Sequence, residues 1–152
     1  MINETEMEKS WARYVLIGVP ILAFIGILAL AIGSSGDDEA ALTGAWELTE
    51  IHVDGSMTAV LESTSPTLVI DETEVSGSGG CNTYGGSISI DGDTLRFGPL
   101  VSTLMFCADP EGVSDQEAAY LSLLDQVDTF EVTDDRLTLR IATDPALIFV
   151  RA

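Results

Sequence analysis

The feature that most constrains this chain is an uncharged apolar segment near its start, from Tyr14 to Ile32. At about 1.5 Å per residue, its roughly 19 residues would form a helix of about 28 Å, close to the ~30 Å hydrocarbon core of a bilayer. Gly18 and Pro20 would weaken a helix in water but are tolerated in a spanning one. The segment therefore predicts one transmembrane helix over residues 14–32.

Charges on either side of this segment predict its orientation. Lys9 and Arg13 precede it, whereas three acidic residues follow it at 37–39. Basic residues stay on the cytoplasmic side, so residues 1–13 are expected to form a cytoplasmic tail. Residues 33–41 read as a flexible, charged linker, and residues 42–152 as an extracytoplasmic domain.

A cleaved signal peptide is the alternative to a retained signal anchor. Ala29-Leu30-Ala31 is an A-x-A site of the kind that signal peptidases cut. The apolar segment is longer than the usual signal core, which favours retention. Either reading exports the C-terminal domain, and the prediction is a single-pass protein of the cell membrane.

The charge of the chain excludes one class of partner. It has 25 acidic and 6 basic residues, a formal net charge of −19. Such a surface repels nucleic acid, because binding of nucleic acid requires Lys and Arg residues that neutralise the phosphates. Solubility in a salty setting explains the acidity most simply, and a diffuse cation buffer is the sharper alternative. The chain has no calcium-loop motif, and neither a specific metal site nor a cofactor is predicted.

The exported part reads as short antiparallel strands. Two hairpins are clearest, one over 87–97 around Asp91-Gly92 and one over 129–141 around Asp134-Asp135. Further strands are expected at 44–53, 67–70, 74–76 and 147–150. The first of these changes phase at Thr49-Glu50, which suggests a bulge.

One amphipathic helix interrupts the strands. Ser114 and Glu117 have the spacing of a capping box at its start. An apolar stripe follows at helical spacing, formed by Ala118, Tyr120, Leu121, Leu123, Leu124 and Val127. The predicted fold class is α+β, mainly antiparallel β, with a curled sheet that is wrapped around or plugged by this single helix.

The two cysteines, Cys81 and Cys107, are expected to form a disulfide, because an even pair in an exported domain has access to an oxidising compartment. Two free buried thiols, or a metal or redox role, are the alternatives. No C-x-x-C motif is present, and His52 is the only histidine.

No catalytic residue can be nominated. His52 reads as an ordinary strand side chain, and no G-x-S-x-G motif accompanies it. The glycine-rich segment 77–86 lacks the lysine of a phosphate-binding loop, so its glycines are expected to permit close backbone approach at a corner of the sheet. Paired carboxylates occur throughout the acidic chain and single out no acid–base pair.

Three strings resemble the META domain family, which includes the HslJ-like bacterial envelope and heat-shock proteins. They are an L-x-G-x-W start at 42–46, a G-C-N-x-Y-x-G string at 80–86 and a T-x-M-x-C string at 103–107. The resemblance implies a partly open, lipocalin-like β-barrel packed with one helix, and no catalytic activity. It carries over only structural positions: Gly80, Cys81, Asn82, Tyr84, Gly86, Met105 and Cys107.

The function expected from these observations is non-enzymatic. The leading hypothesis is a maintenance or stress-response role in the cell envelope through binding of envelope components. The alternative is a module that binds a small apolar ligand in the mouth of the half-barrel. An enzyme is a third and weaker option, because no cleft with a perturbed titratable group is indicated.

Overall fold

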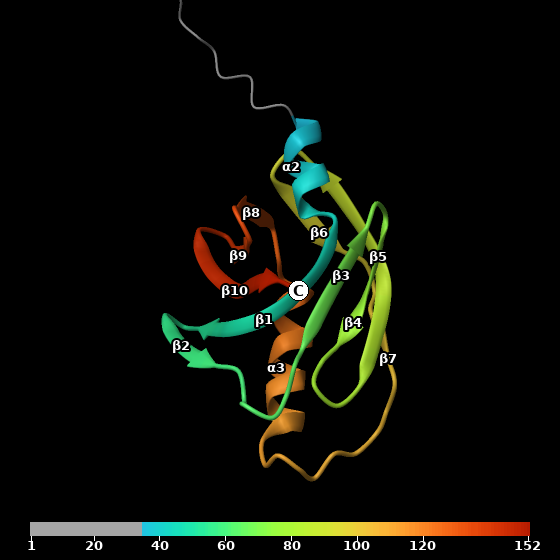
Figure 1. The fold of residues 1–152 in the computed structure, drawn as a ribbon, viewed down its shortest axis with the longest axis vertical. Coiled ribbons are helices and arrows are strands. Elements are labelled where there is room, and N and C mark those ends of the chain that lie inside the picture. The colour runs from blue at the N-terminus through green and yellow to red at the C-terminus, as the bar shows by residue number, and fades with distance from the viewer. Residues whose placement is uncertain (1–34) are drawn as a thin grey trace, which may run out of the picture. The chain divides into compact units, whose positions relative to one another are not determined.

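A computed structural model describes residues 35–152, which form a single antiparallel sheet curled around one helix (Figure 1). The helices are α2 (Ser35–Leu42) and α3 (Val113–Leu124). The strands are β1 (Gly44–Val53), β2 (Ser56–Ala59), β3 (Thr67–Asp71), β4 (Glu74–Ser78), β5 (Thr83–Asp91), β6 (Thr94–Phe97), β7 (Val101–Ser102), β8 (Thr129–Thr133), β9 (Arg136–Ile141) and β10 (Asp144–Arg151).

The sheet closes into a barrel. Its strands follow the order β10-β9-β8-β6-β5-β4-β3-β1, and β10 pairs again with β1. The expectation of a partly open barrel is therefore wrong, because pairing between the first and last strands closes the ring. The thinnest seam lies between β6 and β8, where the ladder contains only the pair Thr94 and Thr129. Strands β2 and β7 lie outside the ring, on β1 and β5.

A bulge in β1 makes this closure possible. The register of β1 against β10 shifts between Leu48 and Glu50, at the predicted break of phase. The hydroxyl of the bulged Thr49 donates to the carbonyl of Ile148 at 3.0 Å, so the displaced strand remains bonded. The bend lets one half of β1 pair with β3 and the other half with β2.

Both predicted hairpins are present. In the first, Ile88 lies opposite Phe97 and Ile90 opposite Leu95, so these four side chains share one face of the sheet. In the second, β8 and β9 pair along their whole length. Asp134 in its turn has a φ of 54°, the left-handed conformation that tight hairpin turns require.

The segment at 33–41 differs from the prediction of a flexible linker, because α2 covers most of it. At the C-terminal end of this helix, Arg151 donates to the carbonyls of Ala41 and Thr43. Leu42 is buried and accepts a 2.8 Å hydrogen bond from the indole of Trp46, over which the Arg151 guanidinium lies. These long-range contacts were invisible in the sequence.

Helix α3 is present, but its start and its buried face differ from the prediction. Its N-cap is Gly112, so Ser114 lies inside the helix and makes no capping bond. The buried face consists of Val113, Glu117, Tyr120 and Leu124, whereas Ala118 is exposed. Apolar residues occur on more than one side of this helix, so the sequence did not determine which side faces the core. Glu117 is polar, so a search for apolar residues could not identify it as buried.

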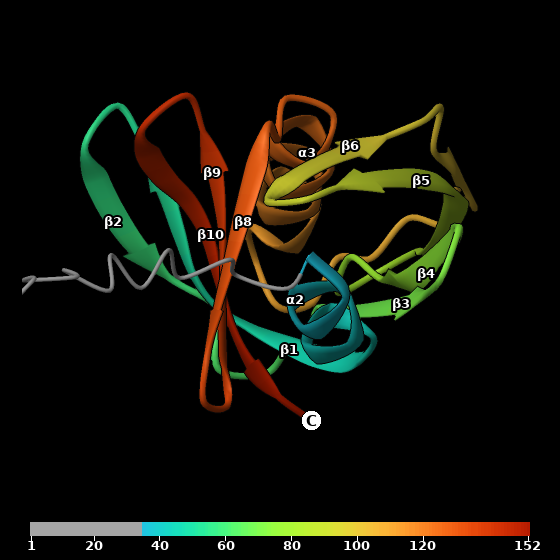
Figure 2. The same cartoon turned by 90° about the horizontal axis from the view of Figure 1, so that it is seen from above.

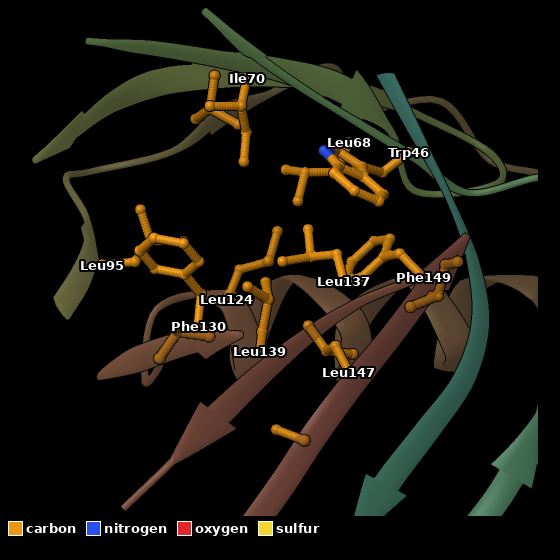
Figure 3. Close-up of a cluster of buried hydrophobic side chains, with 14 of the residues drawn as sticks. Trp46, Leu68, Ile70, Leu95, Leu124, Phe130, Leu137, Leu139, Leu147 and Phe149 are labelled. Carbon is orange, nitrogen blue, oxygen red and sulfur yellow. The ribbon is translucent and has the colours of Figure 1, made fainter. Parts of the chain in front are cut away.

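The interior of the barrel is filled with large side chains. Figure 3 shows part of this core, in which residues of β1, β3, β9 and β10 meet Leu124 of α3. Viewed from above in Figure 2, α3 lies between the β3–β5 side of the sheet and the β8–β10 side. The helix thus completes the core instead of leaving an open cup.

The close packing of β3 against β4 predicts that a side chain at Gly77 would strongly destabilise the domain. A Cβ atom at this position would overlap the backbone oxygen of Thr67. We expect Gly77→Ala to lower the free energy of unfolding by about 2–4 kcal/mol, because a backbone atom cannot move aside cheaply. Gly92→Ala is the control, since Gly92 has positive φ but open space around it and should cost only about 1 kcal/mol. Equal costs in urea unfolding would contradict the clash.

The predicted cytoplasmic tail (1–13) and transmembrane helix (14–32) lie outside the described residues. Among residues 35–152, neither helix has the length and apolarity needed to cross a bilayer.

Candidate functional site

The most exposed apolar residues of the described chain lie together on one loop between β6 and α3. We call residues 101–107 the apolar loop. Leu104 is 99% exposed, Phe106 88% and Met105 58%, and Val101 is also exposed. Exposed apolar side chains that gather in one place often mark a binding surface.

The start of the loop is held by main-chain bonds to β5. Strand β7 pairs Val101 with Gly85 and Ser102 with Tyr84. The next amide, that of Thr103, donates to the carbonyl of Thr83 at 3.0 Å. The loop therefore begins as an extension of the sheet.

Asn82 holds the centre of the loop. Its Oδ1 accepts hydrogen bonds from the amide of Met105 at 2.6 Å and from the hydroxyl of Thr103 at 2.9 Å. Its Nδ2 donates to the carbonyl of Met105 at 3.3 Å. Asn82 itself is buried, and its bonds to the loop are partly buried. One side chain thus binds both the amide and the carbonyl of Met105 and also the hydroxyl of Thr103.

Glu117 of α3 supports Asn82 in turn. Its Oε2 accepts from the amides of Cys81 at 3.1 Å and Asn82 at 2.6 Å, and its Oε1 accepts from Nδ2 of Asn82 at 2.6 Å. The carboxylate is buried among these three donors. The prediction that Glu117 belongs to a capping box is therefore wrong, because its side chain faces the β4–β5 connection.

The disulfide closes the far end of the loop. Cys81 and Cys107 are bonded, with their Cα atoms 5.9 Å apart, which confirms the predicted bridge. The free-thiol and metal alternatives for this pair are thereby excluded. The bridge starts one residue before Asn82, so one short segment of chain anchors both the middle and the end of the apolar loop.

A buried tyrosine pair lies beneath this segment. The hydroxyls of Tyr84 and Tyr120 are 2.6 Å apart, and both lie within hydrogen-bond distance of the carbonyl of Thr67, at 2.9 and 3.3 Å. The rings meet edge to face with their centroids 5.8 Å apart. Burial raises the pKa of both hydroxyls well above the usual tyrosine value.

These raised pKa values predict a loss of stability in alkali. The folded chain keeps both hydroxyls protonated where the unfolded chain would ionise, so their contribution is complete below about pH 10 and is lost as pH rises further. We expect the midpoint of thermal unfolding to fall steeply above pH 10, and less steeply for Tyr84→Phe/Tyr120→Phe. Parallel pH curves for the two proteins would contradict this explanation.

The remaining positions of the resemblance also gather here. Gly80 has a φ of 110° and lies beside Thr64 and Val113. At Gly86, a Cβ atom would come within 2.9 Å of the backbone oxygen of Pro99, which is the close backbone approach that the sequence suggested. Met105 contributes its backbone to Asn82 and leaves its side chain exposed.

His52 does not belong to this site. Its Nε2 lies 2.9 Å from Oε2 of Glu50, whose other oxygen is 3.3 Å from Arg136. The hydrogen bond to His52, assisted by Arg136, lowers the pKa of the Glu50 carboxyl. Residues 35–152 contain no group of three or more His, Cys, Asp or Glu side chains placed to hold a metal ion.

Sequence reasoning missed three supporting residues of the site. Glu117 was assigned to a cap, and Thr103 was noted only as part of a motif. Gln116 was not singled out, although its oxygen accepts from the amide of Leu61 at 2.8 Å and its nitrogen donates to Thr64 at 2.9 Å. Of these three residues only Thr103 carried a signal, because it begins the T-x-M-x-C string of the family resemblance.

Comparisons with known proteins agree with this architecture. The META domain model matches residues 40–152. One similar solved structure is an NMR structure of a protein from Burkholderia xenovorans, with 28% identity and a TM-score of 0.64, covering 75% of this chain and 86% of that one. A second NMR structure, with 23% identity and a TM-score of 0.51 over 69% of this chain and 87% of that one, shares the fold. No curated protein matches the chain. The match over most of its length shows that this chain belongs to the META domain family.

Proposed function

We propose that this chain is a single-pass membrane protein whose META domain lies outside the cytoplasm. There it binds other components of the cell envelope, without catalysis, in a maintenance or stress-response role. The uncharged segment 14–32 and its basic N-terminal flank support this orientation.

The disulfide is the observation that carries the proposal. Disulfides persist in oxidising compartments and are rare in the reducing cytoplasm. Cys81 and Cys107 are bonded beside the buried hydrogen-bond network of Asn82 and Glu117. A chain built around such a bond is suited to an extracytoplasmic location.

The arrangement of side chains favours binding over catalysis. The two groups with strongly raised pKa values, Tyr84 and Tyr120, bond to each other and to a backbone carbonyl inside the core. The four exposed apolar side chains of the loop, Val101, Leu104, Met105 and Phe106, in contrast, carry no hydroxyl, thiol or titratable group. Exposed apolar groups on a fixed backbone supply contact surface.

Protease treatment of spheroplasts tests the location. We expect protease added to intact spheroplasts to remove residues 42–152 and leave a short fragment that contains the span. In a control variant, Asp37, Asp38 and Glu39 are replaced by lysine, which opposes the charge bias and should reduce export. Protection of the domain until the spheroplasts are lysed would overturn the proposed location.

A groove beside α3 favours a second candidate, the binding of a small apolar ligand. It has a volume of about 700 Å³, and its lining combines the apolar Val53, Leu123, Ile141 and Pro145 with the polar or acidic His52, Asp54, Gln126 and Asp144. This volume is typical of small-molecule sites. The groove lies outside the packed core, between the β1–β2 turn, the β9–β10 turn and the helix.

Methyl NMR spectra of the full chain in detergent test this candidate. Titration with hexanol should shift the signals of Leu123 and Ile141 before those of the apolar loop. Ala119→Trp, which fills the groove, should abolish the shifts. Equal shifts in both proteins would remove ligand binding at this groove from consideration.

A further inference from the structure

We propose, building on the envelope-binding function above, that Leu104, Met105 and Phe106 form a docking plug. The plug enters an apolar pocket with a basic rim on another envelope protein. These three residues are the tip of the apolar loop.

Exposure of the tip is the first argument. Leu104 is 99% exposed and Phe106 88%, in a domain whose other large apolar residues mostly fill its core. The ten residues from Pro99 to Ala108 carry no charge, although the whole chain has a net charge of −19. The tip is therefore an uncharged, apolar segment exposed on a strongly acidic chain.

Rigidity of the tip is the second argument. The backbone of Met105 is bonded through both its amide and its carbonyl to Asn82, and Cys107 is covalently joined to Cys81. A loop held in this way loses little conformational entropy when it binds. The loop therefore presents its apolar side chains from a backbone that is already held in place, as a preorganised binding element does.

Charges around the tip indicate the chemistry of the partner. Asp109, Glu111 and Asp115 follow the loop within a few residues, and all three are exposed. No basic residue lies between Arg96 and Arg136 in the sequence. Complementarity across an interface therefore requires Lys or Arg around the pocket that receives the tip.

The same charges disfavour two other occupants. A second copy of this chain would bring like acidic groups together. A bilayer would place Asp109 and Glu111 against a negatively charged surface. In Figure 1, α2 lies at one end of the domain and the chain between β7 and α3 lies at the other.

Photo-crosslinking in cells that make the full chain tests the proposal. A photoreactive amino acid replaces Met105 in one strain and Met57 in the other. Met57 on β2 is a matched control, because it is 59% exposed against 58% for Met105. We expect position 105, and not position 57, to form an adduct with one protein. The crosslinked peptide of that protein should be apolar and flanked by Lys or Arg.

Two further variants test the chemistry of the contact. Phe106→Ser should reduce the adduct at least about tenfold, the loss typical of removing an aromatic hot spot. Asp109→Lys/Glu111→Lys should reduce it too, by opposing a basic rim. Because these side chains are exposed, both variants should still form the Cys81–Cys107 bond, which gel mobility with and without reductant verifies.

The proposal is overturned by equal adducts from positions 57 and 105, by adducts only with lipid or with a second copy, by insensitivity to Phe106→Ser, or by no adduct. Proteolysis of spheroplasts from the same strains distinguishes a failure of the docking plug from a failure of the proposed extracytoplasmic location. An exported domain without the expected adduct contradicts the docking plug alone, whereas a domain that is not exported contradicts the proposed function.

Discussion

Replacing Asn82 by aspartate is expected to lower the free energy of unfolding by about 3–5 kcal/mol. The substitution removes the donor that bonds Oε1 of Glu117 at 2.6 Å and puts a second carboxylate in its place. Two carboxylates in a buried site repel each other, and a buried carboxylate that loses its hydrogen-bond donor costs several kcal/mol. Urea unfolding of the full chain in detergent measures the effect.

A compensating substitution distinguishes this cause from general damage. In Asn82→Asp/Glu117→Gln, the amide of the new glutamine can donate to the new aspartate, and its oxygen can still accept from the amides of residues 81 and 82. We expect the double variant to be at least about 2 kcal/mol more stable than the sum of the single effects. Thr83→Asp adds the same charge at an exposed neighbour and should have little effect. Strict additivity would refute direct pairing of Asn82 with Glu117.

Removal of the disulfide is the second large effect. Cys81 and Cys107 are 26 residues apart, and the chain-entropy model gives about 3.5 kcal/mol for closing a loop of that size. We therefore expect Cys81→Ser/Cys107→Ser to lose about that much free energy of unfolding. This is a large share of the 5–15 kcal/mol typical of a small domain.

Reduction of the unmodified chain provides the control for this prediction. In the presence of a reductant, its unfolding curve should approach that of the serine variant, and the variant itself should not respond. A change of less than about 1 kcal/mol in both tests would show that the contacts of Asn82 and Glu117 hold the loop without the bridge.

The strands were predictable because they depend on local information. Alternation along 44–53 and the Asp-Gly turn at 91–92 are visible within a few residues, and even the bulge at Thr49 left a change of phase. Closure of the barrel was not predictable. It depends on pairing between β1 and β10, which no local pattern reports. Short strands without apolar alternation, β2 and β7, were missed for the same reason.

The candidate site was predictable only in part. The cysteine pair and the position of Asn82 followed from oxidation chemistry and family resemblance. The partner of Asn82 did not, because Glu117 fits both a capping box and a buried acceptor, and only the rotation of α3 decides between them. The exposure of Leu104 and Phe106 was also hidden, since apolar residues in a sequence are ordinarily assigned to the core.

The central claim is that the Cys81–Cys107 disulfide of this META domain forms in an oxidising compartment and there holds the end of the apolar loop in place. Thiol trapping in growing cells tests it most directly. Cells are quenched in acid, denatured and treated with a maleimide mass tag, with or without prior reduction. The account predicts no tag on the unreduced chain and two tags after reduction, on Cys81 and Cys107. Two tags without reduction would contradict it.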